Sequence, residues 1–316
     1  MLKPNFKKLP SHQSTINMIF APTAIQSQQT KTHQPFLLKT NQRLNNNLRQ
    51  HQIEKNAFSV NINYNKTIVN VLNYGHGLGD FLRGSIMLAQ LAKHFNIHFK
   101  LDASRHNISK FLNNESQLLP SETKIHDSLN ENDIYKLIQQ FINSPNETLY
   151  ISTHKCYKNK LVSNDIKQCI NSFFTFKNKY YETAKKYFNL KKYNVLHIRC
   201  KDNDFNSDFE DNNLFSEITK LNLQKNTIII SNNCELKKKI NKLFGFYFIN
   251  NTSGHTGYAK CNLSEFENTI IDFIILSKSS NTYCFSYYSH GSGFSEHCSL
   301  LNNIPYRIKI LPDADI

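Results

Sequence analysis

The feature that most constrains this 316-residue chain is a short β-branched run that passes directly into a glycine-rich turn and then a helix. Residues 67–72 read Thr-Ile-Val-Asn-Val-Leu, which is typical of a buried strand. Residues 75–80 read Gly-His-Gly-Leu-Gly-Asp, and apolar residues then recur at helical spacing through 81–95. A second strand is predicted at 97–101. A strand, a helix and a strand in this order form a βαβ unit, so we expect a parallel sheet.

Strands and helices continue to alternate along the chain in two series. The middle region has predicted helices at 134–142 and 166–174 and a strand at 149–152. The second series has predicted strands at 194–198, 227–230, 246–249 and 282–285, and helices at 235–244, 262–276 and 293–301. Ser264 and Glu267 have the spacing of a capping box for the helix at 262–276. This order predicts an α/β fold with two doubly wound Rossmann-like halves that face a cleft.

Three segments follow from this pattern. Residues 1–64 are rich in Gln, Asn, Thr, His and Lys, so we expect a polar N-terminal arm that is poorly structured. Residues 65–190 are expected to form the first Rossmann-like half. Residues 191–316 are expected to form the second.

The chain carries a net charge of +14 at pH 7. Such an excess favours anionic partners, which include nucleic acids, nucleotide phosphates, anionic glycans and membrane surfaces. The densest cluster, Lys237-Lys238-Lys239, lies among apolar residues at helical spacing and is typical of a solvated helix face. No zinc-finger, basic-zipper or RNP-type pattern occurs, so we expect no specific nucleic-acid partner.

Cysteine usage and hydropathy bear on the compartment. The seven cysteines are odd in number and form no CxxC pair, so we expect buried free thiols in a reducing compartment. No apolar run has the length of a membrane-spanning helix, and the best one, 269–276, is interrupted by Asp272. The N-terminal residues lack the apolar core of a secretory signal. We therefore expect a cytoplasmic protein without a membrane span.

The glycine turn is the first candidate ligand site. Gly75, Gly77 and Gly79 let the backbone turn sharply and approach a ligand closely, and the amides at the start of the helix favour an anion or a polar sugar. The spacing matches neither the Rossmann fingerprint nor the P-loop. Asp80 and Arg83 add polar groups to this turn. A tight turn without a ligand, with Arg83 on the helix surface, explains the same residues equally well.

The second candidate is the end of the strand at 194–198. His197 and Arg199 face the same side, because side chains alternate along a strand. Ligands bind at the carboxyl ends of strands in open α/β sheets, and an arginine there can hold a diphosphate bidentately. Arg199 could instead form a structural ion pair with Asp202.

The third candidate is the loop at 286–295, between a strand and a helix. Its small residues expose backbone amides at a helix start, where phosphates bind. Ser292 and Ser295 add hydroxyl groups. An ordinary helix cap and turn suit the same residues.

Together these features resemble the fucosyltransferase superfamily of alpha-1,6- and alpha-1,2-fucosyltransferases and protein O-fucosyltransferases. Its members have a glycine-bearing first loop before a long helix, a strand ending in His-x-Arg, and a C-terminal strand with a Ser-rich loop before a helix. Here the central motif, 197–202, reads His-Ile-Arg-Cys-Lys-Asp. Residues 230–233 are similar to a family strand ending in Ser/Thr-Asp-Asp, and 267–295 are similar to the closing block. The resemblance covers residues 70–316 in order.

The resemblance implies a GT-B-like fold and transfer of fucose from GDP-fucose to a glycan or other hydroxyl acceptor, without a metal or a cofactor. It makes 65–190 the acceptor half and 191–316 the donor half. Arg199 would hold the β-phosphate and His197 would help to fix the guanosine. The implied donor-binding residues are His197, Arg199, Lys201, Asp202, Ser231, Ser292, Gly293, Phe294 and Ser295. The implied loop beside the acceptor and donor sugars consists of Gly75, Gly77, Gly79 and Arg83.

The chain departs from the family pattern in two places. Cys200 stands where a second arginine is usual, and Lys201 is the candidate replacement. Asn232 and Asn233 stand where acids are often found.

The groups that perform the chemistry are only partly indicated. Arg199 would stabilise the charge that develops on the departing diphosphate. Asp80 and Asp204 are candidate bases for the acceptor hydroxyl, as are Asp208 and Glu210, and a surface carboxylate explains each equally well. Some members of this superfamily have no obvious base, and an inverting, dissociative displacement then depends on positive charge.

Three alternatives stay open. A transferase on the same scaffold could use another nucleotide sugar. Residues 202–204, Asp-Asn-Asp, could be the metal-binding DxD motif of a GT-A transferase. A non-catalytic relative could bind nucleic acid or anionic glycan through its positive charge.

Overall fold

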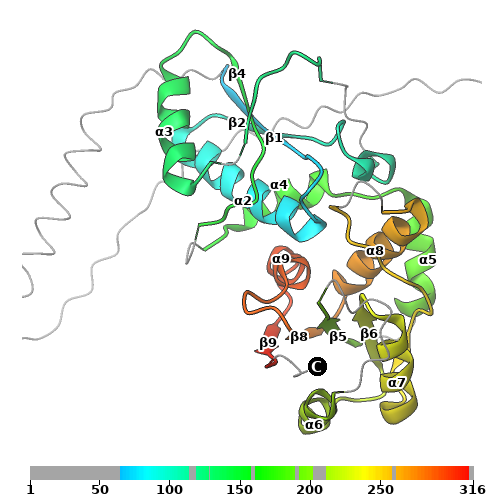
Figure 1. Ribbon diagram of the computed structural model, residues 1–316. Helices are drawn as coiled ribbons and strands as arrows, with labels where there is room; N and C mark the ends of the chain where they lie inside the picture. Colours follow the sequence, from blue (N-terminus) through cyan, green and yellow to red (C-terminus); the bar gives the residue numbers. More distant parts are fainter. Residues whose placement is uncertain are drawn as a thin grey trace, which may run out of the picture.

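The computed structural model describes residues 65–113, 119–127, 129–157, 161–188, 192–201, 211–257 and 261–312. The expected polar arm at 1–64 lies outside the described residues. The described part of the chain forms two parallel sheets with helices around and between them (Figure 1).

The first sheet is built from four parallel strands in the order β2-β1-β4-β3. These are β1 (Thr67–Val71), β2 (His98–Asp102), β3 (Ile125–His126) and β4 (Thr148–Ile151). The chain moves from β1 to one side and then returns to the other side of β1. The neighbours β1 and β4 therefore enclose the switch point, where parallel sheets bind ligands at their carboxyl ends.

The second sheet has five parallel strands in the order β7-β6-β5-β8-β9. These are β5 (Asn194–Arg199), β6 (Thr227–Ser231), β7 (Tyr247–Phe248), β8 (Asn281–Ser286) and β9 (Tyr306–Ile310). Its switch point lies between β5 and β8, which pair in register from Asn194 with Asn281 to Arg199 with Ser286.

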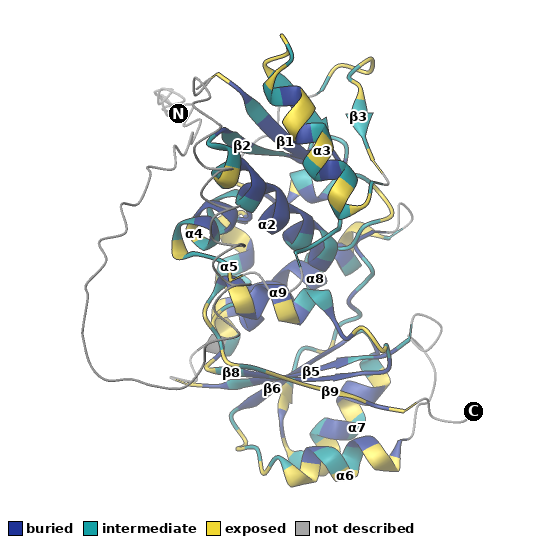
Figure 2. Cartoon of the chain, turned by 90° about the vertical axis from the view of Figure 1, so that its left-hand side faces the viewer, coloured by how far each residue is buried: buried dark blue, intermediate teal, exposed yellow. Residues whose placement is uncertain are grey.

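Helices follow most of the strands. Those of the first series are α2 (Leu78–Phe95), α3 (Glu131–Ile142), α4 (Asn164–Phe173) and α5 (Asn178–Phe188), with a 3-10 turn at Asn107–Lys110. Those of the second series are α6 (Asn212–Lys220), α7 (Cys234–Phe244), α8 (Leu263–Leu276) and α9 (Gly293–Leu301). Figure 2 shows α8 and α9 between the two sheets, and α6 and α7 on the far face of the second sheet.

Two apolar cores result from this layering. The larger core joins both series, because side chains of α8 and α9 pack together with those of α2 and of the first sheet; Ile68, Leu82, Ile270 and Cys298 are examples. The smaller core lies on the opposite face of the second sheet, under α6 and α7. The α/β fold with two Rossmann-like halves, expected from the alternation of strands and helices, is therefore confirmed.

Several local predictions need correction. The predicted capping box of Ser264 and Glu267 is wrong: α8 begins at Leu263, and its N-cap is Asn262, whose side chain accepts a hydrogen bond from the Glu265 amide at 2.8 Å. Lys237 was expected on a solvated face but is buried. The predicted elements also omitted β9, in which basic and apolar residues alternate at the edge of the sheet.

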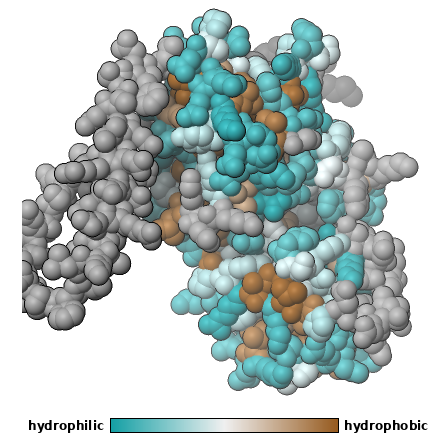
Figure 3. All heavy atoms as spheres, turned by 60° about the vertical axis from the view of Figure 1, so that its left-hand side comes forward, coloured by the Kyte–Doolittle hydropathy of each residue, from teal (hydrophilic) through white to brown (hydrophobic). Residues whose placement is uncertain are grey.

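The surface is mainly hydrophilic, with an apolar area on the lower half in Figure 3, the half that contains β9. Ile308 and Ile310 of that edge strand are 44% and 42% exposed. All seven cysteines are free thiols, and Cys169, Cys200, Cys284 and Cys298 are buried. No helix in the described ranges is long and apolar enough to cross a membrane.

Candidate functional site

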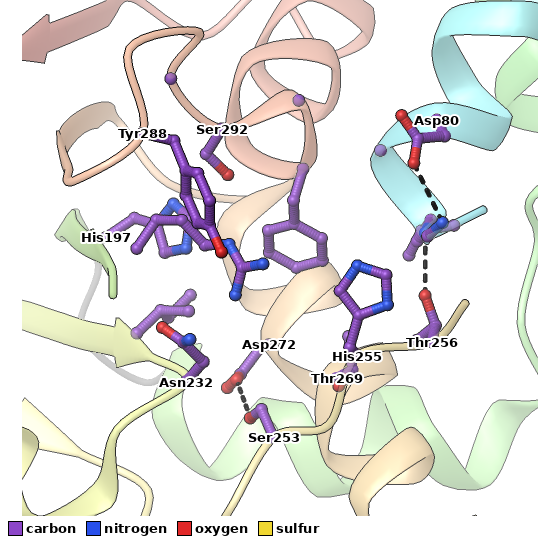
Figure 4. Close-up of a pocket in the computed structure, with 18 of the residues that line it drawn as sticks. Asp80, His197, Asn232, Ser253, His255, Thr256, Thr269, Asp272, Tyr288 and Ser292 are labelled. Carbon is purple, nitrogen blue, oxygen red and sulfur yellow. Dashed lines mark hydrogen bonds between the residues drawn. The ribbon is translucent and has the colours of Figure 1, made fainter. Parts of the chain in front are cut away.

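A cavity of about 360 Å3 opens where the carboxyl ends of the two sheets face each other. It is lined by the start of α2, the ends of β5 and β6, the segment 253–256, one side of α8, and the loop before α9 (Figure 4). From the predicted residues it brings together Gly77, Gly79, Asp80, Arg83, His197, Arg199, Ser231, Ser292, Gly293 and Phe294.

Arg199 ends β5 at the switch point of the second sheet. Its guanidinium carbon lies 5.2 Å from the ring centroid of Tyr288, which follows β8. A guanidinium next to an aromatic face keeps its positive charge and its planar set of donors. The position suits the binding of an anion at the edge of the cavity.

His197 lies two residues earlier on the same face of β5 and is only 4% exposed. Its Nδ1 forms a hydrogen bond with Ser295 Oγ at 2.8 Å, so α9 is tied to β5. Burial, and then the charge of Arg199, lower the pKa of His197 to about 3. A neutral imidazole therefore lies beside the permanent cation at neutral pH.

The helices α2 and α9 both begin at this cavity. Ser292, the N-cap of α9, forms no capping hydrogen bond through its side chain. The first amides of α9 therefore keep a partial positive charge at the cavity, which favours an anion. A Cβ on Gly79 would lie 2.4 Å from the Phe294 amide nitrogen, so only glycine permits this approach of the two helix ends.

Asp80 and Arg83 have structural partners at the start of α2. One Asp80 carboxylate oxygen accepts a hydrogen bond from the Gly77 amide at 3.1 Å, and the other is bound by Arg83 at 2.5 Å. The predicted helix start at Phe81 is three residues late because this cap lets the helix begin at Leu78. Asp80 thus stabilises the helix end, and both its oxygens are engaged.

The sequence motifs did not predict the part of the cavity wall that is formed by the segment 253–256 and α8. Thr256 Oγ1 accepts a hydrogen bond from the Leu78 amide at 2.8 Å, and Ser253 Oγ donates to Asp272 Oδ2 at 2.5 Å. Figure 4 shows Asp272 and Ser253 side by side below the cavity. A signal for Asp272 existed, since it is the only charged residue in the apolar run 269–276.

The ionisation of Asp272 depends on two opposing effects. Burial raises the pKa of the carboxyl group above its usual value, and the charge of Lys237 and the Ser253 hydrogen bond offset only part of this rise. Lys237 is held by Asn251, whose backbone oxygen and side-chain oxygen accept hydrogen bonds from its Nζ at 2.6 and 3.0 Å. Burial lowers the pKa of Lys237.

Cys200 does not line the cavity. Its side chain is buried in the smaller core, on the other face of the second sheet from α8 and α9. Its backbone is clamped to the end of β6, because Asn232 accepts from the Cys200 amide at 2.9 Å and donates to its carbonyl at 3.0 Å. The Cys200 side chain therefore contributes no group to the cavity wall.

The remaining predicted residues lie elsewhere. Gly75 has a φ of +93° and donates its amide to the Gly257 carbonyl at 2.8 Å, outside the cavity lining. Lys201 is half-buried and also outside the lining, and Ser295 is buried behind it. The predicted residues Asp202, Asp204, Asp208 and Glu210 lie outside the described residues, as does the DxD motif. No group of three metal-ligating side chains occurs in the described part of the chain.

Comparison with known proteins identifies the fold. No family model and no curated protein matches the chain. A mutant of Arabidopsis thaliana FUT1 in complex with GDP matches with a TM-score of 0.56 and 10% identity, over 88% of this chain and 78% of that chain. The match shows that the chain shares the fold of FUT1.

Two further structures are similar to smaller degrees. Fucosyltransferase NodZ from Bradyrhizobium has a TM-score of 0.48 and 11% identity, over 79% of this chain and 96% of that one. POFUT1 in complex with GDP-fucose has a TM-score of 0.45 and 9% identity, over 77% of this chain and 98% of that one.

Proposed function

We propose that the protein is a glycosyltransferase that moves fucose from GDP-fucose to a hydroxyl group of a glycan or other acceptor. The observation that carries the proposal is the cavity between the two sheets, where Arg199 and the start of α9 meet. The fold shared with GDP-bound FUT1 supports a nucleotide ligand at this place. The acceptor would enter from the side of the first sheet.

The diphosphate is assigned to the region of Arg199 and α9. A guanidinium can donate two parallel hydrogen bonds to phosphate oxygens, and the amides of Gly293 and Phe294 would add donors from the helix start. Both groups line the cavity. Their charge does not depend on pH near neutrality, which suits a ligand that is permanently anionic.

The guanine base of the donor is assigned to the region of Asp272 and Ser253. Guanine presents an N1–H and an N2–H2 group side by side, and a carboxylate accepts from both at once. Asp272 lines the cavity, and Ser253 fixes one of its oxygens. Adenine has no such pair of donors on that edge, so this carboxylate would select guanine.

The reaction in this proposal is a displacement at C1 of fucose. The bond from C1 to the β-phosphate oxygen breaks, its electron pair leaves with GDP, and the acceptor oxygen forms the new bond from the opposite face. Arg199 and the α9 amides stabilise the negative charge on the leaving diphosphate. The proposal includes no metal ion, so we expect transfer to continue in EDTA.

A donor screen tests the proposal. GDP-fucose, GDP-mannose, UDP-galactose and ADP-glucose are each added to the full chain, and the thermal unfolding midpoint is measured. A ligand at 100 times its Kd stabilises the folded state by about 2.7 kcal/mol. We expect the largest shift with GDP-fucose and release of GDP over time.

Each other outcome has a definite meaning. A larger shift with a UDP- or ADP-sugar would replace the donor and keep the fold and the cavity. No shift with any nucleotide sugar, together with salt-sensitive binding of DNA or RNA, would overturn the transferase assignment in favour of a basic binding protein.

A further inference from the structure

Two histidines lie together at the switch point of the first sheet. His76 is in the loop that follows β1, and His154 follows β4, the neighbour of β1. Nδ1 of His154 lies 3.0 Å from Nε2 of His76, and the ring centroids are 4.7 Å apart in an edge-to-face arrangement. The topology of the sheet thus creates an imidazole–imidazole hydrogen bond between segments 78 residues apart.

Close packing fixes the position of this pair. A Cβ on Gly84 of α2 would lie 1.8 Å from the Thr153 carbonyl oxygen, so only glycine lets the loop after β4 lie against α2. The backbone of His76 is also tightly packed, since a Cβ on Gly257 would lie 2.8 Å from its carbonyl carbon. Both rings are half-buried.

The hydrogen bond has a chemical consequence. Each neutral imidazole carries one N–H, and one of the two hydrogens occupies the bridge. The other hydrogen must then lie on one of the two outer nitrogens, which leaves the remaining outer nitrogen bare. When the bridging hydrogen belongs to His76, the bare nitrogen is Nδ1 of His76 and the outer N–H is Nε2 of His154.

The pair adjoins the cavity, and neither ring is among the residues that line it. His76 immediately precedes Gly77, which lines it, and Asp80 and Arg83 of the lining interact electrostatically with both rings. Among the described residues, no third metal-ligating side chain completes a group with these histidines. Proton transfer is therefore the chemistry that the pair offers.

We propose that the His76–His154 pair takes the proton from the acceptor hydroxyl, with His76 as the base and His154 as its relay. The proposal rests on the proposed function. As the acceptor oxygen bonds to C1 of fucose, its proton moves to Nδ1 of His76. The bridging proton moves from His76 Nε2 to His154 Nδ1, and the Nε2–H of His154 passes its proton to water.

The charges around the pair favour the neutral form. The groups that face it are Asp80 and Arg83 of α2, Lys155 after β4, and Asp127 after β3, and His76 also acts on the buried His106. Burial is the largest effect on both rings and lowers the pKa of each below 6.5, although Asp80 acts in the opposite direction on both rings and Asp127 does so on His76. Both rings are thus unprotonated at neutral pH, as a base must be.

The test uses water as the acceptor, so that no acceptor needs to be known. GDP release from GDP-fucose is measured for the full chain and for the variants His76→Gln and His154→Gln. His94→Gln, on the exposed last turn of α2, is the matched control. We expect a loss of about 100-fold for His76→Gln, the scale of a general base, and a smaller loss for His154→Gln. Binding of GDP should be unchanged in all three.

A second readout separates a relay from a structural contact. His76 lowers the pKa of His154 through its charge, so His76→Gln should raise the pKa of His154 in an NMR titration. A wild-type rate of GDP release in His76→Gln would overturn the role of the pair as a base. The same holds if the wild type binds GDP but releases none from GDP-fucose. Absence of GDP binding by the wild type would overturn the proposed function itself.

Discussion

The two switch points of the molecule have the same backbone plan and different side chains. At the second sheet, the carboxyl ends of β5 and β8 lead to Arg199 and to the start of α9, which keep their positive character at any physiological pH. At the first sheet, the corresponding ends of β1 and β4 lead to His76 and His154, which are neutral and able to exchange protons. Arg199 and the start of α9 line the cavity, and the two histidines adjoin it through Gly77.

Under the proposed function, the difference divides the work of the transfer reaction between the two crevices. A permanent charge is suited to hold a diphosphate and to stabilise it as it leaves. A neutral imidazole is suited to take up a proton and is not suited to hold an anion. Removal of a group from one crevice should therefore affect binding, and removal from the other should affect the chemical step.

The strongest way to break this comparison is Arg199→Ala. Loss of a charged, bidentate contact to a diphosphate should weaken the binding of GDP about 100-fold, which corresponds to about 2.7 kcal/mol. Isothermal titration calorimetry with GDP measures the change. Arg307→Ala is the matched control, because Arg307 lies 5.7 Å from the Tyr283 ring centroid outside the cavity. Equal affinities of the two variants would contradict the assignment.

The next effect concerns the contact between the two crevices. Gly79→Ala should lower the free energy of unfolding by about 1–3 kcal/mol, because its Cβ would meet the backbone of Gly293 and Phe294. Gly77→Ala is the control, since its Cβ would meet nothing closer than 3.5 Å. Urea denaturation measures both. A stable Gly79→Ala variant would show that the helix ends separate at little cost.

A smaller effect is expected at the proposed guanine site. Asp272→Asn replaces an acceptor of two hydrogen bonds by a group with one acceptor and one donor, so the affinity for GDP should fall about tenfold while that for ADP stays constant. The control is Asp165→Asn, which removes a partly exposed ion pair with Lys93. Competition binding with both nucleotides gives the ratio, and an unchanged ratio would remove Asp272 from base selection.

The smallest effect is expected for the dependence of GDP-fucose affinity on pH. The affinity for GDP-fucose should not vary from about pH 6 to about pH 8, because Arg199 stays charged and His197, with a pKa of about 3, stays neutral. GDP release should fall only at a pH below 6.5, because burial holds the pKa of His76 and that of His154 below that value. Rates of GDP release and affinities for GDP-fucose, measured at the same pH values, test whether binding and the chemical step depend on different groups. A parallel decline of both would contradict this.

Regular periodicity explains which parts of this fold the sequence predicts. The strand at β1, the helix α9 and the cavity contact of Arg199 follow from apolar periods and from the rule that ligands bind at carboxyl ends of strands. The start of α2 was missed because its cap depends on the Asp80 carboxylate rather than on an apolar pattern. Lys237 was predicted on the surface because the sequence does not show its partner Asn251, which accepts the hydrogen bond of the buried ammonium group.

Other parts of the site arise only from tertiary structure. The segment 253–256 has no periodicity, and it becomes a cavity wall because Thr256 binds the start of α2. His76 and His154 lie 78 residues apart and meet only because β1 and β4 are neighbours. Strand order is a long-range property, so no local spacing could have paired these two residues.

The apolar core that joins both series has a consequence for how such chains diversify. Because α8 and α9 of the second series pack into the core of the first, a boundary at residue 191 separates two sequence segments but cuts through shared packing. Exchange of a whole half with that of a distant homologue would expose unmatched apolar faces on both sides. Recombination of halves is therefore a poor route to a new ligand specificity here. Variation in the loops after β1 and β4 leaves the core intact and is the route that this architecture permits.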